Sequence, residues 1–173
     1  MRNFIFTLIL GISVAQLAAG EKEKKAAANS NAAVPAALVG QWQSGSISTA
    51  NFYDAATQQW NEPNGRGMFL IVQANGEYRF GAGEQITSTD YFLHQEGTVA
   101  INGLQIVFSP KMASEYVRDV CVHQDDQRAS TKDELQATTL KFQIVANQAD
   151  GRGAELMLTN EHGEQIILRS HAQ

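Results

Sequence analysis

The chain contains one cysteine, Cys121, so no intramolecular disulfide can form. No Cys-x-x-Cys or other cysteine-rich spacing is present, which excludes the common cysteine-based zinc sites. Basic residues are few and do not cluster: 13 Lys and Arg stand against 18 Asp and Glu, which gives a net charge of −5. An acidic surface repels phosphate backbones, so we expect no nucleic-acid partner.

Motifs that carry enzyme chemistry are also missing. GRG and GAG are isolated rather than set between a strand and a helix, so no phosphate-binding loop is predicted. No G-x-S-x-G sequence marks a nucleophile turn. Asp119 alternates with Val117 and Cys121, and we interpret it as part of a structural ion pair with Arg79 or Arg66 rather than as a catalyst. We therefore predict no catalytic residue, no cofactor and no enzyme activity.

The four histidines are scattered along the chain, which argues against a metal site. His94 shares a strand face with Phe92 and Glu96, and we expect it to face solvent or to make a single hydrogen bond. His123 lies in VHQDDQ, which we interpret as an exposed acidic loop rather than a weak cation site. Cys121 lies in the run YVRDVCV, where we expect a buried, inert thiol rather than a dimer link or a reactive group.

Residues 1–20, MRNFIFTLILGISVAQLAAG, have the features of a secretory signal peptide. Arg2 precedes an apolar run from Phe4 to Leu17, and Ala18-Ala19-Gly20 provides small residues for cleavage. The run is short for a membrane anchor and contains polar residues. No cysteine follows the cleavage site, so lipoprotein acylation is not expected. The sequence predicts a secreted or periplasmic protein with no stable membrane insertion after signal cleavage.

Residues 21–37, EKEKKAAANSNAAVPAA, are rich in alanine and charge. They have too little large apolar surface to offset the chain entropy that is lost on folding. We interpret them as a disordered or loosely helical tether and place the folded domain at residues 38–170, which is long enough to bury a core.

The rest of the sequence alternates apolar and polar residues between short turn sequences. Leu140, Phe142 and Ile144 point to one side, while Lys141 and Gln143 point to the other. Tight antiparallel hairpins are favoured by Asn75-Gly76, Asn102-Gly103, Asp150-Gly151 and His162-Gly163. Strands are expected near 41–47, 67–73, 77–81, 85–95, 97–102, 104–109, 114–122, 138–147, 153–160 and 164–170. Residues 130–135 suit one capped helical turn at most.

The expected fold is all-β, an antiparallel up-and-down meander of about eight to ten strands. Strands with one dry face must hide that face, and a closed barrel does so while removing exposed edges. An open sandwich is the alternative. The glycines of FGAGE favour a bend or bulge at that point.

Gly40-Gln41-Trp42 opens the first expected strand, and Arg169 lies near the end of the last one. A G-x-W sequence at the start of such a meander resembles the lipocalin and wider calycin pattern. The resemblance covers most of residues 38–170 and implies a lipocalin-like barrel with Trp42 sealing one end. It also implies that Arg169 packs on the indole ring as a cation–π pair. The second cysteine that many secreted lipocalins use for a disulfide is missing.

The same resemblance implies that the barrel holds a small apolar or amphipathic ligand. The expected ligand contacts are the inward aromatics Phe80, Phe92, Phe108, Tyr116 and Phe142, with Phe52, Tyr53 and Trp60 of the long first loop at the barrel mouth. Those loop aromatics could instead pack on the barrel wall. The alternative function is a filled barrel that acts through protein contacts, as a protease inhibitor or an envelope assembly factor does.

Overall fold

The computed structural model describes residues 33–48, 52–61, 64–147 and 153–171. The predicted signal peptide and most of the predicted tether lie outside these residues. The end of the tether is described: Val34 packs against the barrel interior, and Pro35 accepts a 2.8 Å backbone hydrogen bond from Leu38. The described fold therefore includes residues that precede Leu38, where the domain was expected to begin.

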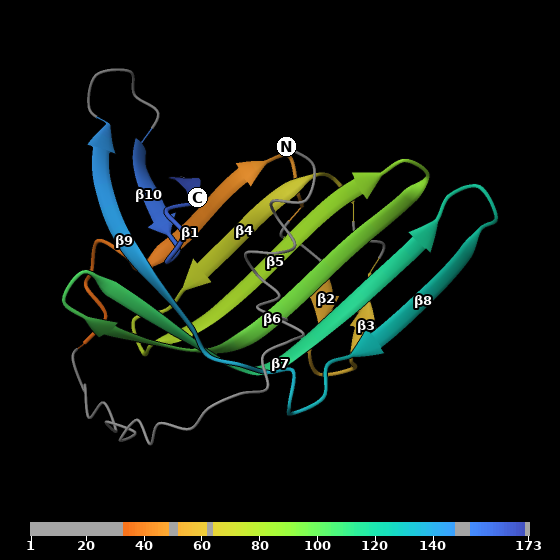
Figure 1. The fold of residues 1–173 in the computed structure, drawn as a ribbon, viewed down its shortest axis with the longest axis horizontal. Coiled ribbons are helices and arrows are strands. Elements are labelled where there is room, and N and C mark those ends of the chain that lie inside the picture. The colour runs from red at the N-terminus through yellow and green to blue at the C-terminus, as the bar shows by residue number, and fades with distance from the viewer. Residues whose placement is uncertain (1–32, 49–51, 62–63, 148–152, 172–173) are drawn as a thin grey trace.

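Eight of the eleven described strands form one closed antiparallel barrel (Figure 1). Its strands are β1 (Gly40–Gly45), β4 (Gly67–Val72), β5 (Glu77–Ile86), β6 (Thr89–Asn102), β7 (Gln105–Asp119), β9 (Thr138–Asn147), β10 (Gly153–Thr159) and β11 (Gln165–Ser170). Each strand pairs with the next in this order, and β11 pairs with β1 to close a barrel of eight strands. The expected all-β meander and its closure are confirmed, and the open sandwich is not formed.

The predicted turns hold the barrel strands together. Asn75-Gly76 joins β4 to β5, Asn102-Gly103 joins β6 to β7, and His162-Gly163 joins β10 to β11. Gly76 has a φ of +84°, a backbone conformation that glycine adopts without steric cost. Asp150-Gly151 lies outside the described residues. The predicted capped turn is also present, since the Thr131 backbone amide donates to a carboxylate oxygen of Glu134 at 2.8 Å.

Several predicted strand boundaries were wrong. Residues 89–102 form the single strand β6, and residues 105–119 form the single strand β7. Gly81 and Gly83 do not interrupt β5, because the strand continues through them and the turn comes at Thr87 and Ser88. Three strands were missed: β8 (Gln124–Ala129), which pairs with β7, and β2 (Tyr53–Asp54) and β3 (Gln59–Trp60), which form a hairpin between β1 and β4.

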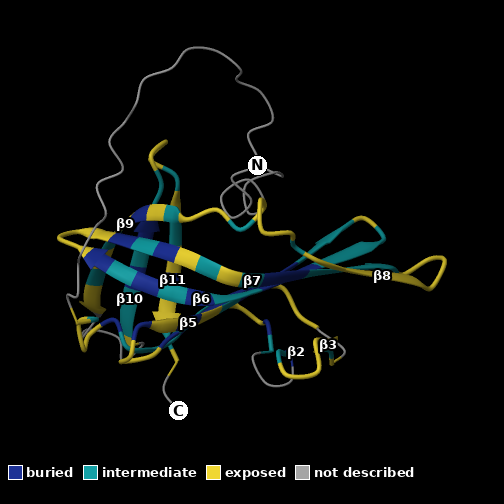
Figure 2. Ribbon diagram, turned by 90° about the horizontal axis from the view of Figure 1, so that it is seen from below, coloured by how far each residue is buried: buried dark blue, intermediate teal, exposed yellow. Residues whose placement is uncertain are grey.

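The strands β6 and β7 are longer than the barrel and continue beyond it. β9 pairs with residues 105–108 of β7, whereas β8 pairs with residues 114–119. We call residues 89–96 of β6, residues 112–119 of β7 and all of β8 the extension. Figure 2 shows it projecting from the barrel, with the β2–β3 hairpin against one face.

A β-bulge separates the barrel part of β7 from its part in the extension. The pairing of β6 with β7 shifts at Glu96 and Gly97, which leaves Lys111 as an extra residue in β7. Because side chains alternate along a strand, one extra residue exchanges the two faces. Phe108 therefore lies in the barrel interior, while Tyr116 lies on the outside of the sheet.

Buried side chains form two separate clusters. The barrel core fills the barrel and includes Trp42, Leu70, Val72, Tyr78, Ile106, Phe108, Leu156 and Leu168. The hairpin cluster lies on the outer face, beneath the β2–β3 hairpin, and contains Ile47, Phe52, Tyr53, Phe69 and Phe92, with Trp60, Ile71, Met112 and Tyr116 packed against them. Alternation along β4 explains the separation, because Leu70 points into the barrel and Phe69 points out of it.

Trp42 is buried in the barrel core, where it is 3% exposed. Its indole Nε1 donates a 2.9 Å hydrogen bond to the carbonyl of Leu38, which is itself fully buried. Val34 packs against the same core and lies close to Gly76 of the β4–β5 turn. Trp42 thus anchors the segment 34–38 at the end of the barrel where β4 turns into β5.

Candidate functional site

The barrel interior contains a cavity of about 50 Å³. The residues that line it are Leu70, Tyr78, Phe80, Gln95, Phe108, Thr138, Leu140 and Ile166. The Tyr78 hydroxyl donates a 2.7 Å hydrogen bond to the Gln95 side-chain oxygen, and burial raises the pKa of Tyr78. A cavity of this size holds about one or two water molecules.

The structure divides the eight predicted ligand-contact residues between the two clusters. Phe80 and Phe108 line the cavity, and Phe142 packs against the barrel core. The expectation that Phe92 and Tyr116 point inwards was wrong, because both belong to the hairpin cluster. Phe92 lies on the face of β6 that points away from the barrel, and the bulge in β7 turns Tyr116 outwards as well.

The three loop aromatics, Phe52, Tyr53 and Trp60, pack on the outside of the barrel wall rather than at its mouth. The Phe52 ring centroid lies 5.3 Å from that of Trp60, 5.4 Å from that of Phe69 and 5.9 Å from that of Phe92. Edge-to-face contacts of this kind add to the free energy gained from burying the rings. The alternative, in which these aromatics pack on the wall, is therefore the arrangement that forms.

Two glycines make room for this cluster. A Cβ at Gly81 would overlap the ring of Phe69, and a Cβ at Gly83 would lie 2.9 Å from the ring of Phe92. Both glycines are on β5, in the FGAGE stretch that was expected to bend the chain. Their function is to leave space above the strand, so that the rings of Phe69 and Phe92 can lie close to the sheet.

His94 is buried at the centre of the hairpin cluster, with an exposed fraction of 0%. The Tyr53 ring stacks on the imidazole, with ring centroids 4.5 Å apart. His94 Nε2 lies 3.1 Å from Glu96 Oε1 and makes the single hydrogen bond expected from the sequence. A carboxylate only accepts, so the proton is on Nε2 and Nδ1 is an acceptor. Among the described residues, Nδ1 of His94 is the buried side-chain nitrogen or oxygen that has no partner.

The charged groups that act on His94 are Glu96 and Arg79. Glu96 Oε1 also lies 3.2 Å from the Nε of Arg79, whose side chain is 49% exposed. The pKa of His94 is lowered, because burial disfavours the charged imidazolium more than the Glu96 carboxylate favours it, while Arg79 adds repulsion. The imidazole is therefore neutral at pH 7.

Ser114 supplies the second buried polar group of the hairpin cluster and is 1% exposed. It lies directly opposite His94 in the pairing of β6 with β7. Trp60 Nε1 donates a 3.0 Å hydrogen bond to the Ser114 hydroxyl, and the Tyr53 side chain bonds to the same residue. Burial raises the pKa of Tyr53. Ser114 thus attaches both strands of the hairpin to the sheet.

The implied contact between Arg169 and Trp42 is not formed. Trp42 pairs with Ser170, and Arg169 pairs with Gln43, so Arg169 lies on the opposite face of the barrel wall from the indole. The Arg169 guanidinium is 57% exposed, and its Nε donates a 3.1 Å hydrogen bond to a Glu155 carboxylate oxygen. Gly40, the third residue of the resemblance, opens β1 with a φ of +140°.

The interpretations of Cys121 and Asp119 were also wrong. Cys121 is exposed, in the turn between β7 and β8, because β7 ends at Asp119 rather than at residue 122. Asp119 accepts backbone hydrogen bonds from Cys121 at 2.8 Å and from Val122 at 3.2 Å. It stabilises this turn instead of pairing with Arg79 or Arg66. His123 is exposed in the same turn.

No protein-family model matches this chain, and none of the curated proteins compared with it does. In the described part of the chain, no helix has the length and apolar character needed to cross a membrane. The same residues contain no group of three or more His, Cys, Asp or Glu side chains placed to hold a metal ion.

Proposed function

We propose that this is an exported binding protein whose outer surface contacts another protein. The observation that supports this proposal is the small volume of the cavity inside the barrel. Pockets that bind small molecules in proteins usually have volumes of about 300–1,000 Å³. The cavity between Phe80 and Phe108 has a volume of about 50 Å³.

The end of the extension is the surface that fits this function best. The turn between β7 and β8 exposes Val120 by 44% and Val122 by 66%. Figure 2 shows this turn at the far end of the extension, away from the barrel. Apolar side chains on a loop that a rigid sheet holds away from the body are typical of a binding surface.

Carriage of a small apolar group is the second candidate, and the lining of the barrel cavity favours it. Six of its lining residues, Leu70, Tyr78, Phe80, Phe108, Leu140 and Ile166, offer apolar surface, and Gln95 and Thr138 add polar groups. Such a lining can orient an amphipathic molecule. The side chains around the cavity would have to move apart to admit one.

Native mass spectrometry of the protein purified from the source organism, in which the full chain is expressed, separates these two functions. We expect the bare mass of the protein or of its oligomer, before and after incubation with mixed fatty acids. A discrete additional mass that organic extraction releases would overturn the protein-contact proposal and support a carrier. The same spectrum tests export, because cleavage after Gly20 fixes the mass of the mature chain.

Site-specific photocrosslinking tests the surface. A photoreactive residue at Val122 should give a covalent adduct with a second protein in the source organism. The matched control is Ile167, an apolar residue on the barrel wall that is 47% exposed. Equal adducts from both positions, or none from Val122, would contradict the proposed surface.

A further inference from the structure

The outer edge of β8 is open. β8 pairs with β7 on one side, and no described residue pairs with its other side. All six of its residues, QDDQRA, are exposed; three of them are charged, and the strand contains no proline, lysine or bulge. Figure 1 shows β8 as the last strand of the extension. Proteins usually protect such an edge, because its unpaired amides and carbonyls can add a further strand.

The hydrogen-bond pattern shows which backbone groups point outwards. The Ser130 amide donates to the Ala113 carbonyl at 2.9 Å, so these two residues form a hydrogen-bonded pair. Hydrogen-bonded pairs recur at every second residue of an antiparallel ladder. The backbone groups of Asp126 and Arg128 therefore point towards β7. Those of Asp125, Gln127 and Ala129, the intervening residues, point to the open edge.

This pattern restricts how a second copy of β8 can pair with the first. The residues with outward backbone groups must form the hydrogen-bonded pairs, so the two copies can pair about any residue of β8. Registers centred on Gln124 or Ala129, at its two ends, leave the rest of the strand unpaired. The remaining registers are centred on Asp125, Asp126, Gln127 or Arg128. Three of these place identical charges opposite each other: Asp125, Asp126 or Arg128 against itself. Only the register centred on Gln127 places Asp126 of each copy opposite Arg128 of the other.

We propose that two copies of this protein pair antiparallel through β8, with Gln127 opposite Gln127. About six backbone hydrogen bonds then join the two extensions into one continuous sheet. Asp126 and Arg128 occupy the closer, non-hydrogen-bonded positions, where opposite charges on facing strands attract. The dimer goes beyond the proposed function, because it names a second copy of the chain as one partner.

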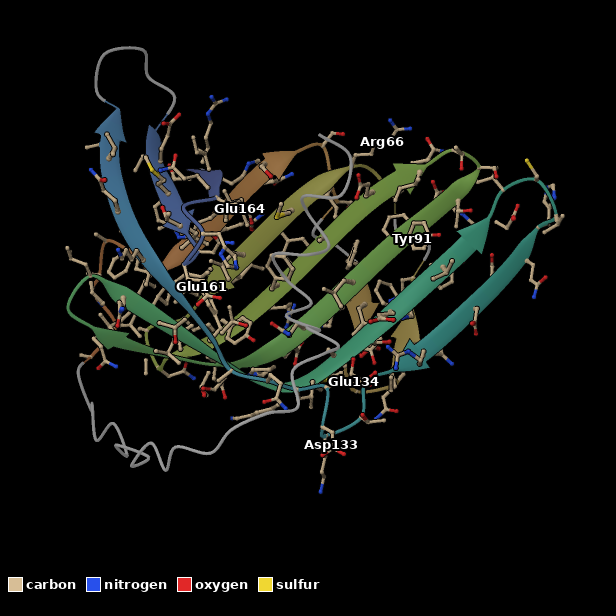
Figure 3. The ribbon with its side chains drawn as sticks, in the orientation of Figure 1. Arg66, Tyr91, Asp133, Glu134, Glu161 and Glu164 are labelled. Atoms are coloured by element: carbon tan, nitrogen blue, oxygen red, sulfur yellow. The ribbon has the colours of Figure 1, made fainter. Side chains whose placement is uncertain are left out.

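The side chains of Asp126 and Arg128 lie on the face of the extension that the hairpin does not cover. Arg128 is positioned there by two carboxylates: its Nη2 lies 3.0 Å from Glu115, and its Nη1 lies 2.7 Å from Glu134. Glu134 is labelled in Figure 3, in the segment that follows β8. These contacts hold the guanidinium over the sheet, beside the position that Asp126 of the second copy would take.

Disulfide trapping tests the register. In a Cys121→Ser background, which removes the exposed native thiol, Gln127→Cys places two thiols at the symmetry axis. Facing residues of a hydrogen-bonded pair have Cα atoms about 5.5 Å apart, within the range of a disulfide. We expect a disulfide-linked dimer under mild oxidation. Asp125→Cys is the control on the same strand and face, and should remain uncrosslinked because it faces Ala129 of the second copy.

Charge exchange tests the contact by sedimentation over a concentration series. We expect the unmodified chain to form a dimer. Asp126→Arg and Arg128→Asp should each raise the dissociation constant of the dimer at least about tenfold. In each variant dimer, two pairs of like charges face each other across the strands. A mixture of the two variants should form dimers again, because both charge pairs are then restored.

A monomer at all concentrations, or crosslinking of Asp125→Cys equal to that of Gln127→Cys, would overturn the proposal. Failure of the mixed variants to associate would overturn the charge pairing. None of these results bears on the mass-spectrometric test, which measures a bound ligand. Failure of the dimer and failure of the proposed function are therefore distinguishable.

Discussion

The two tryptophans lie in the two clusters, and their surroundings show how differently the clusters are built. Trp42 belongs to a barrel strand with pairing partners on both sides, so its backbone is fixed by the sheet. Trp60 belongs to a hairpin that forms a separate two-stranded sheet. Side chains attach that hairpin to the body: the Trp60 bond to Ser114, the 2.9 Å bond from the Gln127 side chain to the Gln58 carbonyl, and the packed rings.

The difference is one of cooperativity. Disruption of the barrel core breaks the pairing of all the barrel strands, so we expect it to unfold with the whole molecule. The hairpin can leave its cluster without breaking a strand pair of the barrel, and such attachments open locally at lower cost. The barrel is therefore the stable platform, and the hairpin cluster is the region that responds to conditions.

The largest effect on the free energy of unfolding is expected when a buried aromatic side chain in either cluster is replaced by alanine. Trp42→Ala should lower the free energy of unfolding by about 3–5 kcal/mol, as for other large buried aromatics. Phe52→Ala should lower it by only about 1–2 kcal/mol, because the hairpin can detach first. Urea denaturation followed by circular dichroism measures both values. Equal losses would mean that the hairpin cluster unfolds together with the barrel.

The next largest loss of stability is expected when the space that Gly81 leaves above β5 is filled. Gly81→Ala should destabilise the protein by about 1–3 kcal/mol, since the new methyl group overlaps the ring of Phe69. The double variant Gly81→Ala/Phe69→Leu should lose less than the sum of the two single variants, because the smaller side chain removes the overlap. Additive losses in the thermal melts would contradict this contact.

A smaller effect is expected from pH. The lowered pKa of His94 means that the folded cluster binds a proton less tightly than the unfolded chain. The stability provided by neutral His94 is complete above about pH 6.5, the unfolded pKa, and is lost as the pH falls towards the lowered folded pKa. In a Trp42→Phe variant, Trp60 emission should therefore report hairpin opening at a lower urea concentration at pH 5.5 than at pH 7.5.

His94→Gln is the matched control for that experiment. Glutamine retains an N–H donor for Glu96 but does not titrate. Its urea midpoint should change less between the two pH values than that of the chain with His94. Equal changes would assign the pH dependence to groups other than His94.

The smallest effect is expected at Arg169. Arg169→Ala removes an exposed pair with Glu155 and should change stability by less than about 1 kcal/mol. In a Trp60→Phe background, the emission of Trp42 should remain the same, because the guanidinium lies on the opposite face of the wall. A shifted spectrum would restore the contact that the lipocalin resemblance implied.

The barrel was predictable because its signals are local. Alternation such as that of Leu140 and Phe142, and turns such as Asn75-Gly76, act within a few residues and are present in the structure. The bulge in β7 was not predictable, because nothing in the sequence around Lys111 distinguishes an extra residue in a strand from the end of a strand. β8 was missed for a related reason: exposed on both faces, it has no apolar alternation.

The hairpin cluster depends on contacts between distant parts of the chain. The sequence placed His94 on the face of Phe92 and Glu96, which is correct. It could not show that Tyr53, on a distant loop, would cover the imidazole. The glycines of β5 were a usable signal: two glycines on one strand face can mark a site where large side chains approach the sheet.

The closure of the barrel by β1 and β11 has a consequence for the folding rate. The hairpin of β6 and β7 pairs residues that are close in sequence, so its loop costs little entropy to close. The contact between Gln43 and Arg169 joins opposite ends of the folded chain and costs more. We expect β6 and β7 to pair early in refolding and β1 and β11 to pair last. Until that last step, a newly synthesised chain exposes two further open edges, which makes the interval before closure the period of greatest aggregation risk.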